Sequence, residues 1–144
     1  MAKHFLVPVD GSPQADKALE HVFENHPDAV VTAIHIIDPI DGSYSAESAM
    51  IGFSEEWYQN AQQHAENLFE EAQERADEHG IELHTDTEVG RPARAIVEYA
   101  ADEDNDIDHI VMGSHGRSGV SRILLGSVAE TVVRRSSVPV TVVR

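Results

Sequence analysis

Three of the four glycines in the stretch MGSHGRSGVSRILLGSVAETV, from Met112 to Val132, form with the serines around them the clearest group of residues with binding chemistry. Gly113, Gly116 and Gly126 lie between an apolar run and an amphipathic one. Glycine adopts positive φ and has no Cβ to keep a ligand at a distance, so Gly113 and Gly116 would let backbone N–H groups converge on phosphate oxygens. The spacing therefore favours an anion-binding loop over a simple chain reversal.

The residues that follow these glycines suit the same chemistry. Ser127 begins an amphipathic segment, and the first N–H groups of a helix attract anions because they lack partners and lie at the positive end of the helix dipole. Arg117 or Arg122 can add charge-assisted hydrogen bonds. Residues 109–144 contain five arginines and one acidic residue, whereas residues 1–108 contain five basic and 25 acidic residues. The stretch therefore lies in the basic part of an acidic chain.

A second interpretation of these residues needs no ligand. Ser127 and Glu130 have the spacing of a capping box, in which the serine accepts from the third helical N–H and the glutamate reaches back to the serine N–H. Gly126 can close the turn RILLG that precedes it. On the residues of this stretch alone, both interpretations stay open.

Asp10 ends the first apolar run of the chain, KHFLVPVD. An acidic side chain at the end of a strand can accept hydrogen bonds from ribose hydroxyls, as it does in dinucleotide-binding folds. A single aspartate in this position can equally be a helix cap or a turn residue. Asp10 is therefore a candidate ligand residue whose partner the sequence alone does not name.

Alternating apolar runs and helical repeats predict the order βαβαβαβαβ along one domain, residues 1–144, with a loop at Asp38–Phe53. We expect a doubly wound α/β fold, with a five-stranded parallel sheet and helices on both faces. Ligands bind such sheets beyond the carboxyl ends of the strands, which places Asp10 and the glycine stretch together. The expected strands are Lys3–Asp10, Ala29–Ile37, Ile81–Val89 at an edge, Asp108–Gly113 and Val138–Val143; the expected helices begin at Pro13, Glu55, near Pro92 and at Ser127.

These residues carry a resemblance to a known family. The segment GSHGRSGVSRILLGS matches the pattern G-x2-G-x9-G-[ST]. It is accompanied by PVDGS near the start, HIID at the end of the second run and VPVTVV near the end. The chain resembles the nucleotide-binding universal stress proteins over essentially its whole length. The resemblance implies an adenine-nucleotide fold with sheet order 3-2-1-4-5 and ATP as ligand, with Mg²⁺ or Mn²⁺ as a possible companion ion.

The resemblance also implies roles for particular residues. Those near the adenine and ribose would be Pro8, Val9, Asp10, Ile36 and Met112; those around the triphosphate, largely through backbone amides, would be Gly113, His115, Gly116, Gly126, Ser127 and Val128, with Arg117 as an additional phosphate contact. Arg117 occupies a position that varies within the family. The metal-binding residues are not assigned.

Composition excludes several function classes. The formal net charge of −16 repels nucleic acid and anionic membranes. The chain has no cysteine, and no apolar run approaches the roughly 18–20 residues of a membrane span. We expect a cytoplasmic protein that binds neither nucleic acid nor membrane.

Sequence motifs for efficient catalysis are also missing. The chain lacks G-x-x-x-x-G-K-[ST] and a G-x-S-x-G serine, and its nine histidines show no zinc-site spacing. Together with the glycine stretch and Asp10, the resemblance implies a regulatory ATP-binding protein active in the stress response. The alternatives are a slow ATPase or nucleotidyl hydrolase at the same site, and a nucleotide-free dimeric scaffold.

The last apolar run, Val138–Val143, predicts self-association. A short uncharged strand at the end of a sheet leaves an unpaired edge that a second copy can extend. The family dimerises through its last strand, so we expect a homodimer.

Overall fold

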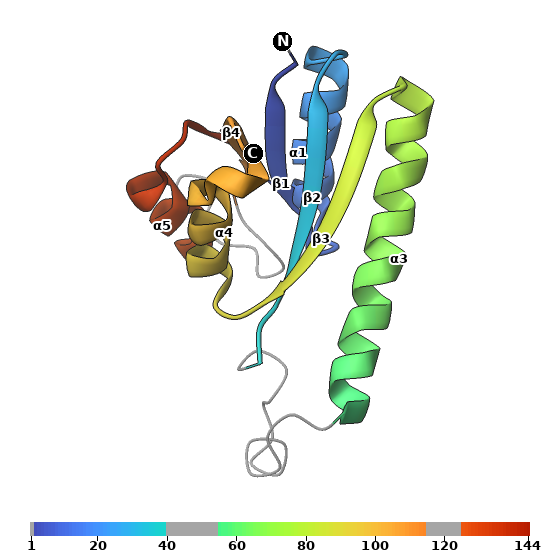
Figure 1. Ribbon diagram of the computed structural model, residues 1–144, viewed down its shortest axis with the longest axis vertical. Helices are drawn as coiled ribbons and strands as arrows, with labels where there is room; N and C mark the ends of the chain where they lie inside the picture. The colour runs from blue at the N-terminus through green and yellow to red at the C-terminus, as the bar shows by residue number, and fades with distance from the viewer. Residues whose placement is uncertain (1, 40–54, 115–124) are drawn as a thin grey trace.

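Five parallel strands form the middle layer of the fold in the computed structural model, which describes residues 2–39, 55–114 and 125–144 (Figure 1). Their order is β3-β2-β1-β4-β5, which confirms the predicted sheet. The strands are β1 (His4–Pro8), β2 (Val30–Ile37), β3 (Glu82–Val89), β4 (His109–Gly113) and β5 (Val140–Val143). The chain leaves β1 toward β2 on one side and later returns to β4 on the other, so the order reverses between β1 and β4.

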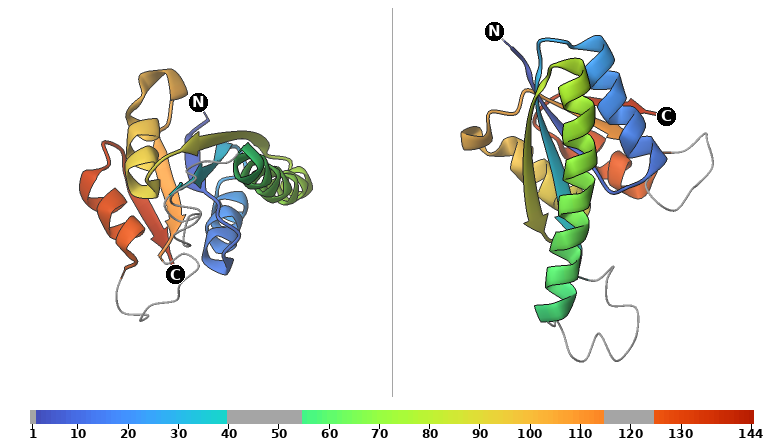
Figure 2. Two further views of the ribbon diagram at one scale, coloured as in Figure 1. Left: turned by 90° about the horizontal axis from the view of Figure 1, so that it is seen from below. Right: turned by 90° about the vertical axis from the view of Figure 1, so that its right-hand side faces the viewer.

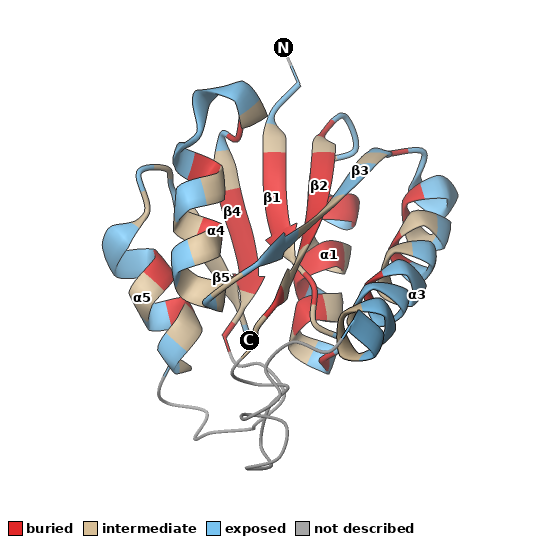
Figure 3. Cartoon of the chain, turned by 60° about the horizontal axis from the view of Figure 1, so that its bottom comes forward, coloured by how far each residue is buried: buried red, intermediate tan, exposed pale blue. Residues whose placement is uncertain are grey.

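Helices cover both faces of this sheet, as the sequence predicts (Figure 2). They are α1 (Pro13–Asn25), α3 (Glu55–His79), α4 (Pro92–Ala101) and α5 (Ser127–Arg135). One apolar cluster joins α1 and α3 to the sheet, and a second joins α4 and α5 to the opposite face. Figure 3 shows the result: β1, β2 and β4 are buried along their middle, β3 is half-buried to exposed, and the outer side of α3 is exposed.

Local sequence explains why α1 begins where it does. The Ser12 side chain accepts a hydrogen bond from the Ala15 N–H at 3.2 Å, and Pro13 takes the first helical position, where its missing N–H costs nothing. Leu19, Val22 and Phe23 then recur at helical spacing and are buried against the sheet. The start of α1 is thereby held at the carboxyl end of β1.

The last strand is shorter than the sequence predicts, because β5 begins at Val140 rather than Val138. The Val138 N–H donates to Ser136 Oγ at 3.1 Å, so Val138 belongs to the turn after α5. Pro139 follows and has no N–H to donate to a strand ladder. Four residues remain to pair with β4, beginning with Val140 beside Ile110.

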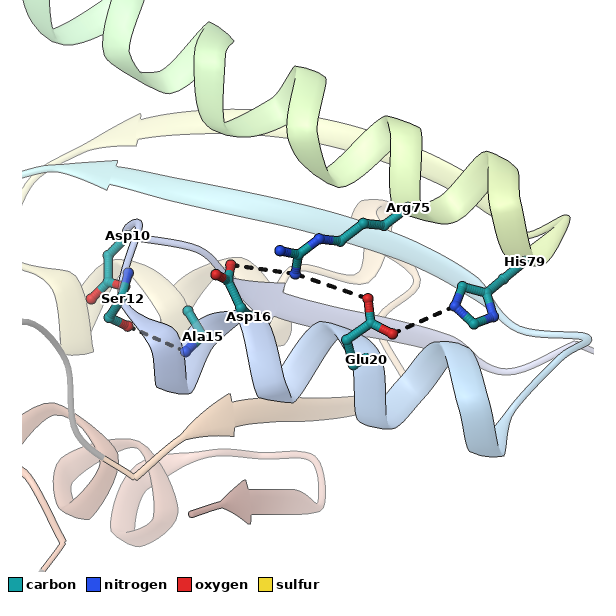
Figure 4. A network of polar contacts seen from close by, with 7 residues as sticks. All are labelled: Asp10, Ser12, Ala15, Asp16, Glu20, Arg75 and His79. Atoms are coloured by element: carbon teal, nitrogen blue, oxygen red, sulfur yellow. Dashed lines mark hydrogen bonds and ion pairs between the residues drawn. The ribbon is translucent and has the colours of Figure 1, made fainter.

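A half-exposed polar network joins α1 to α3 (Figure 4). Arg75 of α3 lies 3.6 Å from an Asp16 oxygen and 3.9 Å from a Glu20 oxygen, and His79 Nε2 lies 3.5 Å from the other Glu20 oxygen. Such solvent-screened pairs contribute only about 0–1 kcal/mol each. The apolar cluster beneath them therefore supplies most of the α1–α3 contact.

Within the described ranges, none of the helices has both the length and the apolar character needed to cross a membrane.

Candidate functional site

The candidate site lies where β1 and β4 end side by side. Leu6 pairs with Ile110, and the same register continued along both strands places Asp10 level with Ser114. In parallel α/β sheets, ligands bind in the crevice where the strand order reverses. At this end of the sheet β1 leads into the turn before α1, and β4 ends beside it at Gly113.

Asp10 is part of the turn that begins α1. Its Oδ1 accepts a hydrogen bond from the Ser12 N–H at 2.9 Å, and Gly11 between them has φ +82°, a left-handed conformation that favours glycine. The turn interpretation of Asp10 is thus confirmed. No described residue donates to Oδ2 of Asp10, so the same carboxylate retains an acceptor oxygen at the strand end.

Val9 reaches the site through its backbone alone. Its side chain belongs to the buried cluster under α1 and α3. Its N–H donates to the Ile34 carbonyl at 2.8 Å, and its carbonyl accepts from His35 Nδ1 at 2.7 Å. Pro8 alternates with Val9 along the strand and so faces the α4–α5 side.

The structure brings three other predicted site residues together on that α4–α5 face. Met112 is buried in the second cluster, and Ile36 and Val128 pack against it half-buried. These side chains come from β2, β4 and the first turn of α5. They form an apolar wall on one side of the strand ends, of the kind that a purine base packs against.

Gly113 lies directly against α1. A Cβ on Gly113 would lie 2.7 Å from the Cβ and 2.8 Å from the carbonyl carbon of Gln14 in α1, and Gly113 does not have a positive φ. The missing side chain therefore makes room for α1. The side-chain direction of Gly113 thus faces α1 rather than a ligand, and the predicted contact of its backbone with phosphate stays a prediction.

Two backbone hydrogen bonds close the base of the glycine stretch. The Gly126 N–H donates to the Ser114 carbonyl at 2.8 Å, and the Ser114 N–H donates to the Val143 carbonyl at 2.8 Å. Ser114 itself is buried. The beginning of α5 is therefore tied directly to the end of β4, which the sequence pattern did not indicate.

The capping box predicted as an alternative is not formed. Gly126 is the N-cap residue of α5 and makes no side-chain cap bond, and Ser127 is the first helical residue. The Glu130 carboxylate instead lies 2.6 Å from the Arg134 guanidinium one turn later. Ser127 is exposed at the helix start, where the first helical N–H groups have no partner within the helix.

Three of the predicted nucleotide contacts, His115, Gly116 and Arg117, lie outside the described residues. So does most of the predicted loop at 38–53. Their roles remain predictions.

Two residues near the site were not singled out by sequence reasoning. His35 contacts the Val9 carbonyl, and Ser114 links the end of β4 to the end of β5 and to the start of α5. The available signal for His35 was a polar residue near the carboxyl end of a largely apolar strand.

A surface groove of about 380 Å³ lies elsewhere, along the exposed side of α1 as far as Val143. Its charged lining includes Asp16, Glu20 and Glu24 together with Lys17. Three carboxylates against one ammonium group repel a phosphate. This groove is therefore a poor place for a nucleotide.

The two histidines with lowered pKa values, His4 and His109, lie at the amino ends of β1 and β4, away from the candidate site. Burial, together with the nearby His84, lowers the pKa of His4, whose Nε2 lies 2.6 Å from Thr32 Oγ1. Burial, Lys3 and His26 lower the pKa of His109. No group of three or more metal-binding side chains occurs among the described residues.

Comparison with known proteins places this arrangement in a family. The model of the universal stress protein family matches residues 1–144. The solved structure of MJ0577 from Methanocaldococcus jannaschii is 34% identical, with a TM-score of 0.83 over 99% of this chain and 96% of that one.

Two further similar structures were determined with nucleotides bound. A universal stress protein in complex with cAMP is 25% identical, with a TM-score of 0.68, and the match covers 99% of this chain and 97% of that one. An Arabidopsis thaliana member of the family with AMP bound is 19% identical, with a TM-score of 0.67 over 98% of this chain and 90% of that one, a likeness of fold alone. By its sequence over the full length and by its fold, the chain belongs to the universal stress protein family.

Proposed function

We propose that this chain binds ATP at the edge formed by the ends of β1 and β4, and acts as a nucleotide-dependent regulatory dimer in the cytoplasmic stress response. The observation that carries the proposal is that Asp10 and the start of α5 lie at the same end of the sheet. The Gly126–Ser114 hydrogen bond holds the start of α5 there, and its N-cap residue makes no side-chain cap bond. Asp10 provides an acceptor for ribose hydroxyls, and the helix start provides N–H donors for phosphate oxygens.

The apolar wall adds the third part of a nucleotide site. Ile36, Met112 and Val128 lie on the face that also holds the start of α5, so a base packed there would have its phosphates directed toward the helix N-terminus. The cAMP and AMP complexes of related proteins support an adenine nucleotide as the ligand class. The proposal of a triphosphate rests on the glycine stretch.

The test measures ATP binding by isothermal titration calorimetry in salt-matched buffer, with and without Mg²⁺ or Mn²⁺, and GTP as control. We expect ATP to bind and the Asp10→Ala variant to bind more weakly. Asp10→Asn is the matched control, because its side-chain oxygen still accepts from Ser12 while the charge is removed. Absence of ATP binding at millimolar concentration would instead favour a nucleotide-free scaffold.

The same samples test for catalysis. If ATP acts only as a ligand, its binding lowers the free energy of the state that binds it by RT ln(1 + [L]/Kd). This is about 2.7 kcal/mol at a hundredfold excess of ATP over Kd. We expect release of phosphate well below the roughly 1 s⁻¹ of slow ordinary enzymes. Faster turnover would make the protein an ATPase or nucleotidyl hydrolase.

The proposed dimer uses the free edge of β5. Residues Val140–Val143 are all half-buried and carry no charge, whereas β3 at the other edge carries Glu82, His84, Asp86 and Glu88. Charged side chains protect an edge strand from pairing, so the β5 edge is the one suited to a second copy.

Backbone direction allows a specific test of this dimer. The carbonyls of Pro139 and Val143 point toward β4, and the alternation of a strand therefore directs the Val142 N–H outward. Val142→Pro should give a monomer in sedimentation velocity while the β4–β5 pairing is kept. Val142→Ala, which retains the N–H, should remain dimeric; a dimeric proline variant would contradict the edge-to-edge arrangement.

A further inference from the structure

We infer that His35 is a positioning residue for the nucleotide site, because it fixes the β1–α1 turn that carries Asp10. This inference rests on the proposed function and adds a residue that does not itself contact the ligand. It starts from the 2.7 Å hydrogen bond between His35 Nδ1 and the Val9 carbonyl.

Val9 is the residue between the last paired position of β1 and Asp10. β1 ends at Pro8, which pairs with Ile34. Beyond that pair, the Val9 N–H still donates to the Ile34 carbonyl, and the His35 ring holds the Val9 carbonyl. Both polar groups of the Val9 backbone are therefore held by β2, one residue before the proposed ribose acceptor.

The His35 ring can make this contact only as a donor, because a carbonyl oxygen only accepts. Nδ1 therefore carries a hydrogen atom. The ring lies on the α1–α3 face of β2, where His64 of α3 contacts it edge to face with centroids 5.7 Å apart. His35 is thereby held between the Val9 carbonyl and α3.

The turn beyond Val9 depends on this support. Gly11, which has φ +82° there, has no Cβ to restrict its backbone to one conformation. Asp10 and Ser12 are joined to each other by a local hydrogen bond, which sets the shape of the turn but not its position relative to the sheet. The Val9 carbonyl is the last fixed backbone group before that turn. A correctly placed carboxylate needs such support to bind without further ordering.

The experiment compares ATP with 2′,3′-dideoxy-ATP, which lacks the hydroxyls that Asp10 would accept from. We expect the wild type to prefer ATP by about tenfold, the effect of roughly one charge-assisted hydrogen bond. His35→Leu should lose this preference, as Asp10→Ala should. His35→Asn should keep it, because the asparagine Nδ2 occupies nearly the place of Nδ1 and also donates.

This ratio separates positioning from general damage to the fold. A variant that only destabilises the protein weakens the binding of ATP and of 2′,3′-dideoxy-ATP alike, so the ratio of the two affinities stays near tenfold. His84→Leu, which replaces a histidine of the neighbouring strand β3, should also leave the affinity ratio unchanged. His35→Ala replaces His35→Leu if circular dichroism shows that the leucine variant does not fold.

The outcomes distinguish the inference from the proposed function. Wild-type protein that binds no ATP overturns both. Wild-type protein that prefers ATP, together with leucine and alanine variants that keep the same preference, overturns the role of His35 and leaves ATP binding intact. Loss of the preference in His35→Leu with retention in His35→Asn supports it.

Discussion

Gly113→Ala should destabilise the protein because it forces a strand and a helix apart. The new Cβ would lie 2.7 Å from the Gln14 Cβ, 2.8 Å from the Gln14 carbonyl carbon and 3.0 Å from its oxygen. Carbon atoms pack best at about 3.5–4.0 Å, so α1 has to move away from β4 by roughly 1 Å. Two of these atoms are backbone, which a rotamer change cannot displace.

The expected cost is the balance of two effects. Overpacking of this kind costs about 1–3 kcal/mol, and replacing glycine by alanine recovers about 0.4–1 kcal/mol by restricting the unfolded chain. We expect a net loss of roughly 1–2 kcal/mol, or about 3–8 °C in Tm for a chain of this size. Because α1 begins next to Asp10, ATP affinity should fall as well.

Urea unfolding and calorimetric ATP binding measure the two effects, with Gly80→Ala as the matched control. Gly80 has φ +67° and open space around its Cβ direction, so alanine there is strained by roughly 1–2 kcal/mol without any clash. This control should lose stability and keep ATP affinity. A Gly113→Ala variant as stable as wild type would refute the close-packing argument.

Three further predictions test the helix start, the buried histidines and the surface charge. Gly126→Asp adds a side-chain cap to α5, so the free energy of unfolding without ligand should rise by about 0.5–1 kcal/mol. The ATP affinity should fall, because the new carboxylate competes with phosphate for the same N–H groups. A rise in both stability and ATP affinity would exclude phosphate binding at this helix start. The pKa values of His4 and His109 are lowered in the folded state, so stability is fully present above the unfolded pKa of 6.5 and decreases as the pH falls through it. Urea unfolding from pH 7.5 to 5.5 should show that the free energy of unfolding changes less with pH in the His4→Gln, His109→Gln double variant than in the wild type. An equal pH dependence would contradict this origin. On α3, Glu70 lies one turn from Glu66 and one turn from Glu74, and all three side chains are exposed. Glu70→Gln should therefore raise the free energy of unfolding by about 0.4–1 kcal/mol at low salt and by much less at 1 M salt. A gain that does not depend on salt would contradict charge repulsion as the cause.

Much of the fold could be predicted because its signals are local. The Ser12 cap and Pro13 determine where α1 begins, and the 3–4 spacing of its apolar residues determines which side is buried. Runs such as the one in β2 predict strands buried on both faces. Where the local signal was ambiguous, as at Val138, the predicted boundary differed by two residues.

The candidate site was predictable only in outline. The strand-end position of Asp10 follows from the order of elements, since parallel strands place their carboxyl ends at one edge. The same sequence left open whether Ser127 caps α5, and the structure gives that position to Gly126. A four-residue motif cannot settle this, because the N-cap depends on where the preceding chain is held.

By itself the sequence determined the alternation of strands and helices, the acidic surface and the family pattern, since each depends on residue type and short-range spacing. Only the tertiary structure decided that Gly113 makes room for α1, that Ser114 holds the start of α5, and that His35 supports Val9. These contacts join residues far apart in the chain. Strand register and the face on which each side chain lies determine them, and both are properties of the assembled sheet.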